Sequence, residues 1–564
     1  MIDGLNPALI FIVGGALVPF VPQGFARNVY LLLLPVLSFV QLWTLPHGDF
    51  AVVHAFGLTL TTLRVDNLSF VFAVVFHIAA FLSVIYALHL RDALQQAVGL
   101  IYPGAALGVV LAGDLVTLFV YWELAAVSSV FLIWARRTER AYRAGMRYLL
   151  VQVCSGVLLL AGVILHVRDT SNPIFGPLSL DHLGGVLIFL AFGIKCAFPL
   201  LHNWLQDAYP EATVTGTVVL SAFTTKMAIY ALARGYAGTE LLITIGTVMA
   251  MFPIFYAVIE NDLRRVLAYS MNNQLGFMVV GVGIGTELAL NGAAAHAFAD
   301  ILFKGLLFMS MGAVLLRTGT VNGSDLGGLY KSMPVTTGLC MVGAASISAF
   351  PLFSAFATKS LIMEAAAQEG HWLCWLFLLF ASAGVFHHAG IKIPYFAFFA
   401  HDSGIRCQEA PTHMLIAMSL AACLCLGIGL FPGALYAILP YPLDYQPYTV
   451  THVITQLQLL TFSALAFAVL IRTGVYPPEL RSVNLDLDWL YRRVLPTAAK
   501  DLWDTIEGLH QRVIDSAQQP IQAIVNTLYR HHGPEGRLAR TWPTGSMVLW
   551  VAVLLASCLI FYYV

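Results

Sequence analysis

Four ionisable side chains in this sequence stand inside long apolar stretches. Glu123 lies in "YWELAAVSS", Lys195 in "GIKCAFPLLHNW", Lys226 in "SAFTTKMAIYALAR" and Lys359 in "AFPLFSAFATKS". A charge in the bilayer interior costs on the order of 3 kcal/mol or more, so a charge that persists there usually faces a partner or water. We therefore interpret these residues as functional rather than as packing residues.

A glutamate and lysines placed in this way could store and pass protons. A lysine in a low-dielectric site can lose its proton near neutral pH, and a nearby carboxylate restores its charged form. A Glu–Lys pair is therefore a tunable proton store. Lys195→Ala or Glu123→Ala variants that assemble and still transport normally would contradict this hypothesis.

A stripe of ionisable residues follows in "HAFADILFKGLLF". His296, Asp300 and Lys304 are spaced i, i+4 and i+8, which places them on one face of a helix. Histidine adds a group that titrates near neutral pH. A structural alternative stays open, in which Asp300 and Lys304 form an ion pair with each other.

A third group occurs in "VFHHAGIKIPYF", where His387, His388 and Lys392 lie close together. We assign all three to the same proton pathway. The alternative for Lys392 is that a lysine near the end of a span extends its ammonium to the lipid headgroups.

The letters "AFPL" occur twice, around Pro199 and Pro351, each time near a lysine. Proline breaks a helix, and the freed carbonyls need water or polar neighbours at membrane depth. The two prolines lie 351 − 199 = 152 residues apart, in the seventh and twelfth apolar spans by our count. An odd offset predicts an inverted-topology repeat, as in many transporters.

Composition identifies the elements that must carry these residues. The 564 residues are 59% hydrophobic and only 10% charged, with a net charge of −1, so nothing indicates a nucleic-acid partner. Spans of about 20 apolar residues predict about sixteen transmembrane helices. Their centres lie near residues 14, 37, 77, 105, 124, 155, 194, 224, 250, 275, 303, 350, 386, 421, 462 and 554. The eight cysteines form no CxxC pair, so we predict no disulfide framework, metal site or cofactor.

Basic residues predict the orientation of the chain. The segment "ARRTERAYRAGMR" after the fifth span carries five arginines, and such loops face the cytoplasm. Counting outward from it places the N-terminus outside, in a multi-pass protein of the inner (cytoplasmic) cell membrane.

The polar segment from about Asn484 to Trp542 differs from the rest of the chain. Leu502, Ile506 and Leu509 recur there at helical spacing, which predicts one or two amphipathic helices. A charge-free last span, 548–564, would anchor this segment in the membrane. The segment is either a small cytoplasmic linker or a helix lying along the membrane face.

Taken together, the motifs around the buried charges resemble the antiporter-like subunits of respiratory complex I and of Mrp-type multisubunit cation/proton antiporters. The resemblance covers about residues 65 to 430, and the D-type subunits of the Mrp antiporters look most similar. It implies a core of 14 helices with two inverted five-helix units and a hydrated axis. The axis would comprise Glu123, Lys195, Lys226, Lys304 and Lys359.

The resemblance also implies roles for single residues. Glu123 and Lys195 would form a switching pair, Lys226 and His296 would link two half-channels, and Lys359 and Lys392 would lead to an exit. The tail resembles the lateral-helix extension of the distal complex I subunit.

These expectations divide the chain into six parts. They are N-terminal helices (1–97), a first five-helix repeat (98–236), a second, inverted repeat (237–400), C-terminal core helices (401–475), an amphipathic lateral segment (476–544) and a terminal anchor (545–564).

The predicted function is that of a proton-translocating subunit of a multisubunit Na⁺/H⁺ antiporter. It would have no catalytic chemistry of its own, and its partners would be other membrane subunits. Two alternatives stay open: a pumping subunit of a complex I-like oxidoreductase or membrane hydrogenase, and the proton channel of an inorganic-carbon uptake complex. The exchanged cation, the driving force and the identity of the partners are not determined by the sequence.

Overall fold

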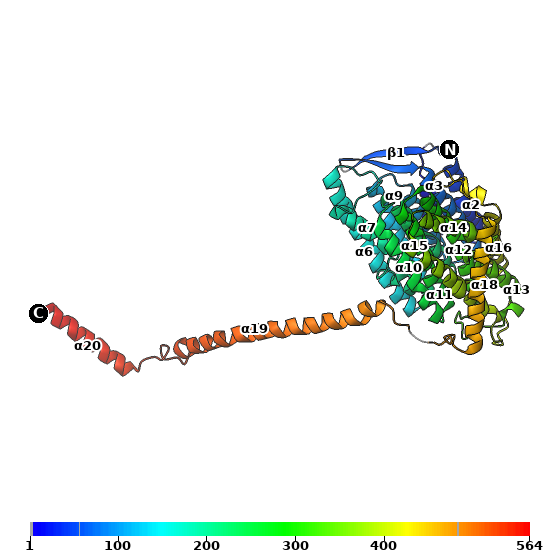
Figure 1. The fold of residues 1–564 in the computed structure, drawn as a ribbon. Coiled ribbons are helices and arrows are strands. Elements are labelled where there is room, and N and C mark those ends of the chain that lie inside the picture. The colour runs from blue at the N-terminus through cyan, green and yellow to red at the C-terminus, as the bar shows by residue number, and fades with distance from the viewer. Residues whose placement is uncertain (1–3, 56, 482–483, 564) are drawn as a thin grey trace. The chain divides into compact units, whose positions relative to one another are not determined.

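The computed structural model describes residues 4–55, 57–481 and 484–563, which fall into two compact units, Met1–Asn484 and Leu485–Val564. The larger unit is a bundle of helices with a β-hairpin at one end (Figure 1). Among the described residues, 12 helices are long and apolar enough to cross a membrane. Fifteen of the predicted centres fall within a helix, and the centre near 350 falls in a break between two helices.

The first part of the bundle contains the hairpin. Its helices are α1 (Pro7–Leu17), the short helix η1 (Val18–Phe20), α2 (Phe25–Thr44), α3 (Asn67–Tyr86) and α4 (Ala93–Leu111). The antiparallel strands β1 (Gly48–Ala55) and β2 (Leu58–Val65) pair from Gly48 with Val65 to Ala55 with Leu58. We predicted helices alone, and the hairpin was missed because strands of eight residues are too short to register in a search for spans.

The middle of the chain forms two segments whose helices match in part. The first segment contains α5 (Leu115–Trp134), α6 (Glu139–Thr170), α7 (Leu183–Lys195), α8 (Asn203–Ala208), η2 (Tyr209–Glu211) and α9 (Val214–Gly235). The second contains α10 (Glu240–Ile259), α11 (Leu263–Ile284), α12 (Glu287–Thr318), η3 (Leu329–Lys331), α13 (Pro334–Ile347), α14 (Ser354–Gln368) and α15 (Trp372–Val385).

Each "AFPL" sequence builds the same helix break. Ala197 and Ala349 adopt left-handed backbone angles just after α7 and α13, at φ 61° and 56°. The next residue in each case bonds back five positions, as Phe198 N–H does to the Gly193 carbonyl, which is a Schellman cap. A turn then follows with proline second and a left-handed leucine third, the arrangement of a type II turn. Four letters thus encode a complete cap and turn.

A second pair of features repeats at constant spacing. Asp114 forms an isolated bridge with Ile174, and Asp262 forms one with Asn322. Both offsets between the two segments are the same, since 262 − 114 = 148 and 322 − 174 = 148. Each aspartate caps the helix that follows it, α5 or α11, by accepting backbone N–H groups.

The remaining elements complete the bundle and form the smaller unit. A run of π-helix continues α15 as η4 (Phe386–Lys392) and η5 (Tyr395–Phe399), followed by α16 (Thr412–Leu430), α17 (Pro432–Tyr436) and α18 (Val450–Thr473). The smaller unit holds η6 (Leu490–Val494), α19 (Leu495–His532) and α20 (Thr544–Tyr563). The predicted amphipathic segment is thus one helix, α19, which continues through Pro520.

Candidate functional site: a buried row of ionisable groups

A fully buried ion pair lies between α9 and α12. The Nζ atom of Lys226 is 2.7 Å from an Asp300 carboxylate oxygen, and neither side chain is exposed. The ammonium also donates to the Ser221 carbonyl at 3.0 Å. The alternative prediction of an ion pair between Asp300 and Lys304 is therefore wrong. Asp300 pairs with Lys226 on a neighbouring helix and not with Lys304 on its own helix.

The other two residues of the α12 stripe contact neighbouring helices. Lys304 donates to the Ser270 hydroxyl of α11 at 2.6 Å. The His296 ring lies 2.9 Å from the Gln274 amide oxygen and 3.1 Å from the Thr358 hydroxyl. The α12 stripe thus faces α11 and α14 through polar contacts.

Glu123 and Lys195 lie close enough to act on each other electrostatically. The Lys195 ammonium donates to the Trp122 carbonyl at 2.6 Å and sits 4.5 Å from the centre of the Trp122 ring. Glu123 packs against Gly156 of α6, where an added Cβ would lie 1.5 Å from a carboxylate oxygen. A glycine is required there, because any side chain would displace the carboxylate.

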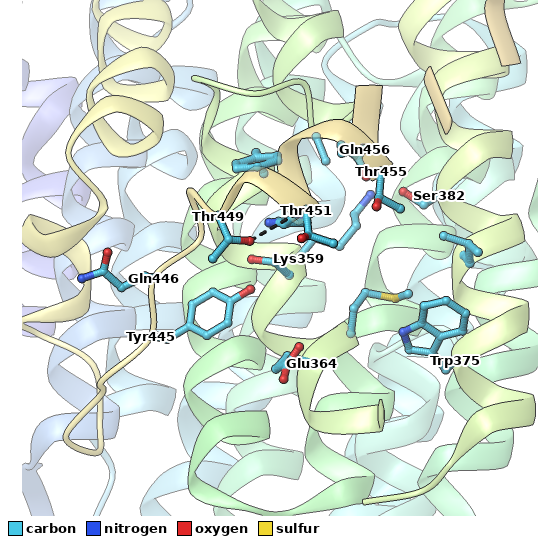
Figure 2. A pocket seen from close by; sticks show the side chains of 16 residues that line it. Lys359, Glu364, Trp375, Ser382, Tyr445, Gln446, Thr449, Thr451, Thr455 and Gln456 are labelled. Atoms are coloured by element: carbon cyan, nitrogen blue, oxygen red, sulfur yellow. Dashed lines mark hydrogen bonds between the residues drawn. The ribbon is translucent and has the colours of Figure 1, made fainter. Parts of the chain in front are cut away.

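Lys359 is one of the residues that line a cavity of about 460 Å³. Its ammonium has no hydrogen-bond partner among the described residues and lies 4.7 Å from the centre of the Phe277 ring. Figure 2 shows hydroxyl and amide side chains around the cavity. Those that it labels are Ser382, Tyr445, Gln446, Thr449, Thr451, Thr455 and Gln456, together with the carboxylate of Glu364. Such a lining suits water.

Lys392 on η4 is fully buried, so it does not extend to the lipid headgroups. Its ammonium donates to the carbonyls of Ala257, Val258 and Glu260 at 2.6–3.2 Å, which belong to the end of α10. It also lies 2.9 Å from a carboxylate oxygen of Glu479. Sequence reasoning missed Glu479, which follows α18 in "YPPEL" and carries no local signal of a site.

The two histidines of η4 differ in their surroundings. His388 is fully buried, and neither ring nitrogen has a hydrogen-bond partner in the described part of the chain. His387 packs its ring against Phe467 and Tyr476 at centre distances of 5.1 Å and 5.6 Å. All three residues predicted in this group therefore lie along one π-helical turn, a geometry that recurs at functional sites.

Several buried amides mark polar space that the sequence analysis did not assign. Neither amide atom of Gln152, Gln206 or Asn272 has a hydrogen-bond partner within the residues that the structure describes. A buried polar group without a partner costs about 1–3 kcal/mol, so such groups are normally satisfied by water. The amide run "NNQ" at 272–274, inside an apolar span, was a signal that could have identified part of this set.

Comparison with known proteins identifies a family whose sequence profile matches the region that carries most of these charged residues. Residues 112–385 match the sequence profile of the family described as "NADH:quinone oxidoreductase/Mrp antiporter, TM". Residues 112–385, just under half of the chain, belong to this antiporter-like family. The matched region contains the site residues from Glu123 to Lys359, whereas Lys392 and Glu479 lie beyond it.

Members of the antiporter-like family with different names resemble the chain to a similar degree. Hydrogenase-4 component B of Escherichia coli is 27% identical over 419 residues, which cover 65% of this chain and 62% of the relative. The D-type subunit of the Na⁺/H⁺ antiporter of Bacillus subtilis is 27% identical over 294 residues, covering 49% and 60%. The chain thus spans about three fifths of the length of these relatives.

The fold agrees with a solved family assembly. The Mrp complex of a Dietzia species contains a chain that matches with a TM-score of 0.75 at 24% identity, covering 99% of this chain and 62% of that one. The predicted resemblance to the antiporter-like family is confirmed. The D-type antiporter subunit is not distinguished from the other relatives, because the hydrogenase component is equally identical over a longer stretch.

Proposed function

We propose that this chain is a proton-translocating subunit of a multisubunit Na⁺/H⁺ antiporter in the inner cell membrane. Protons would pass along the buried ionisable groups from Glu123 and Lys195, through Lys226 and the α12 stripe, to Lys359 and the η4 group. The observation that carries the proposal is the Lys226–Asp300 pair, which joins the first segment of the bundle to the second inside the buried core. A structural scaffold has no need of a charge pair at that depth.

The two matching segments support an inverted repeat within a 14-helix core. We assign the first repeat to residues 98–236 and the second to residues 237–400. The identical breaks around Pro199 and Pro351 and the two bridges at a constant offset of 148 residues support this assignment. Broken helices near the midplane are typical of transporters built from such repeats.

Water in two regions would connect the row of charges to solvent. The unpartnered amides of Gln152, Gln206 and Asn272 offer hydrogen bonds to water beside α6, α8 and α11. The cavity of about 460 Å³ offers water to Lys359 from another side. We propose that these are the two half-channels. We also propose that the loop after α5 and the start of α6, which together carry the five arginines, face the cytoplasm.

The smaller unit would bind a neighbouring subunit. α19 is roughly 57 Å long at 1.5 Å per residue, and Leu502, Ile506 and Leu509 are more than half exposed. An apolar stripe of this length needs a covering surface. We propose that α19 is a lateral helix that lies on the next subunit and that α20 is its anchor.

Proton translocation by the assembled complex tests the proposal. The assembly is purified through a tag on this chain, reconstituted into liposomes and followed with an internal pH dye while its partner reaction or a Na⁺ gradient drives it. We expect Lys226→Met to reduce proton flux at least tenfold. Lys331→Gln, which removes a surface ion pair of the same 2.7 Å length, is the matched control and should leave the flux unchanged. Equal flux in Lys226→Met and wild type would contradict the proposal.

A redox-driven assembly is the second candidate, favoured by the similarity to hydrogenase-4 component B. The same residues would then move protons, but electron transfer in partner subunits would drive them. Partners that co-purify with this chain distinguish the two. Iron–sulfur or quinone-binding subunits would support the redox-driven complex, and small membrane subunits alone would support the antiporter.

A further inference from the structure

The Lys392 end of the row contains a carboxylate from a separate part of the chain. Glu479 belongs to the segment that follows α18, and its side chain is only 5% exposed. Two further contacts fix this segment on the bundle: Arg481 contacts the Asp325 carboxylate at 2.8 Å, and Asn484 donates to Glu260 at 3.2 Å. Glu479 is therefore held against Lys392 by a tethered segment.

The oxygen atoms around Lys392 favour its charged form. Its nitrogen faces four oxygen acceptors: the three carbonyls at the end of α10 and the Glu479 carboxylate. An ammonium has three protons to donate, and a neutral amine has two. The last carbonyls of a helix also carry partial negative charge, which favours a cation. Loss of the proton would leave a buried carbonyl without its donor.

Glu479 differs from Lys392, because it also lines a cavity. It lines a cavity of about 330 Å³ together with Ser324, His401 and Tyr476. Apart from the ion pair with Lys392, neither carboxylate oxygen accepts a hydrogen bond from a described residue, so both are free to bind water. Burial raises the pKa of Glu479, and the charge of Lys392 only partly opposes this shift.

Several ionisable groups lie near Glu479, and their contacts limit which of them could exchange protons with it. Lys392 faces it from η4 and Glu260 from the end of α10, and His401 lines the same cavity. Tyr476 lies on the same segment, and the His387 ring packs against it. Of these, the Glu260 carboxylate already accepts hydrogen bonds from the Asn484 amide and from the backbone N–H groups of Asn261 and Asp262.

We propose that Glu479, and not Lys392, is the proton-exchanging group at this end of the row, with Lys392 as a fixed positioning cation. The inference rests on the proposed function. A hydronium ion in the cavity would give its proton to the Glu479 carboxylate and leave water and a neutral carboxylic acid. The acid would then pass that proton toward the neutral ring of His387, which packs against Tyr476 of the same segment, and this transfer restores the carboxylate and forms an imidazolium. Transfer in the reverse direction uses the same steps.

Two substitutions in the reconstituted assembly distinguish the two residues. Glu479→Gln preserves shape and removes the exchangeable proton, so proton flux should fall at least tenfold, while Glu479→Asp should restore part of it. Lys392→Arg keeps the charge but cannot release a proton near neutral pH, and flux should stay within about threefold of wild type. Arg168→Gln, which removes an exposed ion pair with Asp169, is the control and should behave like wild type.

The opposite pattern would overturn the inference. If Lys392→Arg abolishes flux while Glu479→Gln keeps it, the lysine is the carrier. If Glu479→Gln fails to assemble, Lys392→Arg alone decides, because loss of flux in an assembled Lys392→Arg complex contradicts a fixed cation. The proposed function itself fails if the assembled wild type moves no protons, or if Lys226→Met moves as many protons as wild type. The inference about Glu479 alone fails if wild type is active and Glu479→Gln has the same flux.

Infrared spectroscopy detects protonation of Glu479 directly, which a purely structural role of this residue would not require. One component of the carboxyl C=O absorption that appears when wild type is acidified should be missing in Glu479→Gln and retained in Arg168→Gln. Spectra in which Glu479→Gln matches wild type would count against the inference.

Discussion

Lys226 and Asp300 lie 2.7 Å apart with neither side chain exposed, and they join α9 to α12 across 74 residues of sequence (300 − 226). Removal of one partner from a buried pair leaves an uncompensated charge, which costs more than the loss of a surface pair. The pair thus ties the stability of the bundle to the same residues that we assign to proton transfer.

Single substitutions in this pair should destabilise the bundle strongly. We expect Lys226→Met and Asp300→Asn each to cost about 3–5 kcal/mol, because each leaves a buried charge unpaired. The double variant Lys226→Met with Asp300→Leu should cost much less than the sum. Thermal unfolding in detergent measures this, and Lys331→Gln, at the half-exposed pair with Asp402, should cost no more than about 1 kcal/mol. Additive costs would contradict a direct pair.

Gly156→Ala should impair proton flux without unfolding the protein. The new methyl group would lie where the Glu123 carboxylate now packs, so the acid must move. A Gly→Ala change inside a helix otherwise stabilises by about 1 kcal/mol. Gly305→Ala in α12 is the control, because no atom lies within 4 Å of the added carbon. Equal flux in both variants would show that the position of Glu123 is unimportant.

The cavity next to Lys359 should be accessible to water. We expect a cysteine introduced by Thr455→Cys, in a background without the native cysteines, to react with a small, membrane-impermeant maleimide. Ser310→Cys, at a fully buried position, should react at least tenfold more slowly. Equal protection at both positions would mean that the cavity is closed to solvent.

Asp66 should make the stability of the bundle depend on pH. It caps α3 and accepts two 2.7 Å hydrogen bonds from Arg234. Burial acts to raise the pKa of Asp66, but Arg234 and the Ser69 N–H outweigh it, so the pKa is lowered on folding. A lowered pKa contributes stability above the unfolded value of about 3.9, and that contribution is lost as the pH falls through the folded value.

Asp66→Asn isolates this charge, because asparagine still serves as an N-cap. The unfolding temperature of wild type should fall as the pH is lowered from about 5 to 3, and this fall should be smaller in Asp66→Asn. Identical pH dependence in the two proteins would contradict a role for this carboxylate.

The sequence by itself determined the local features of this protein. Apolar run length located the helices, and the α12 stripe was evident from its spacing of four residues. The two "AFPL" breaks were also predicted, because proline and the residues beside it act through their own backbone. The buried charges were recognisable because charge is rare in apolar spans.

Tertiary structure decided which of these residues meet. Asp300 is four residues from Lys304 but pairs with Lys226, and Glu479 reaches Lys392 across 87 residues (479 − 392). Helical periodicity fixes which face a residue occupies, whereas the rotation and packing of neighbouring helices select its partner, and both depend on contacts between segments distant in sequence. For the same reason the Lys359 cavity, walled by α14, α15 and the start of α18, had no counterpart in any single stretch of sequence.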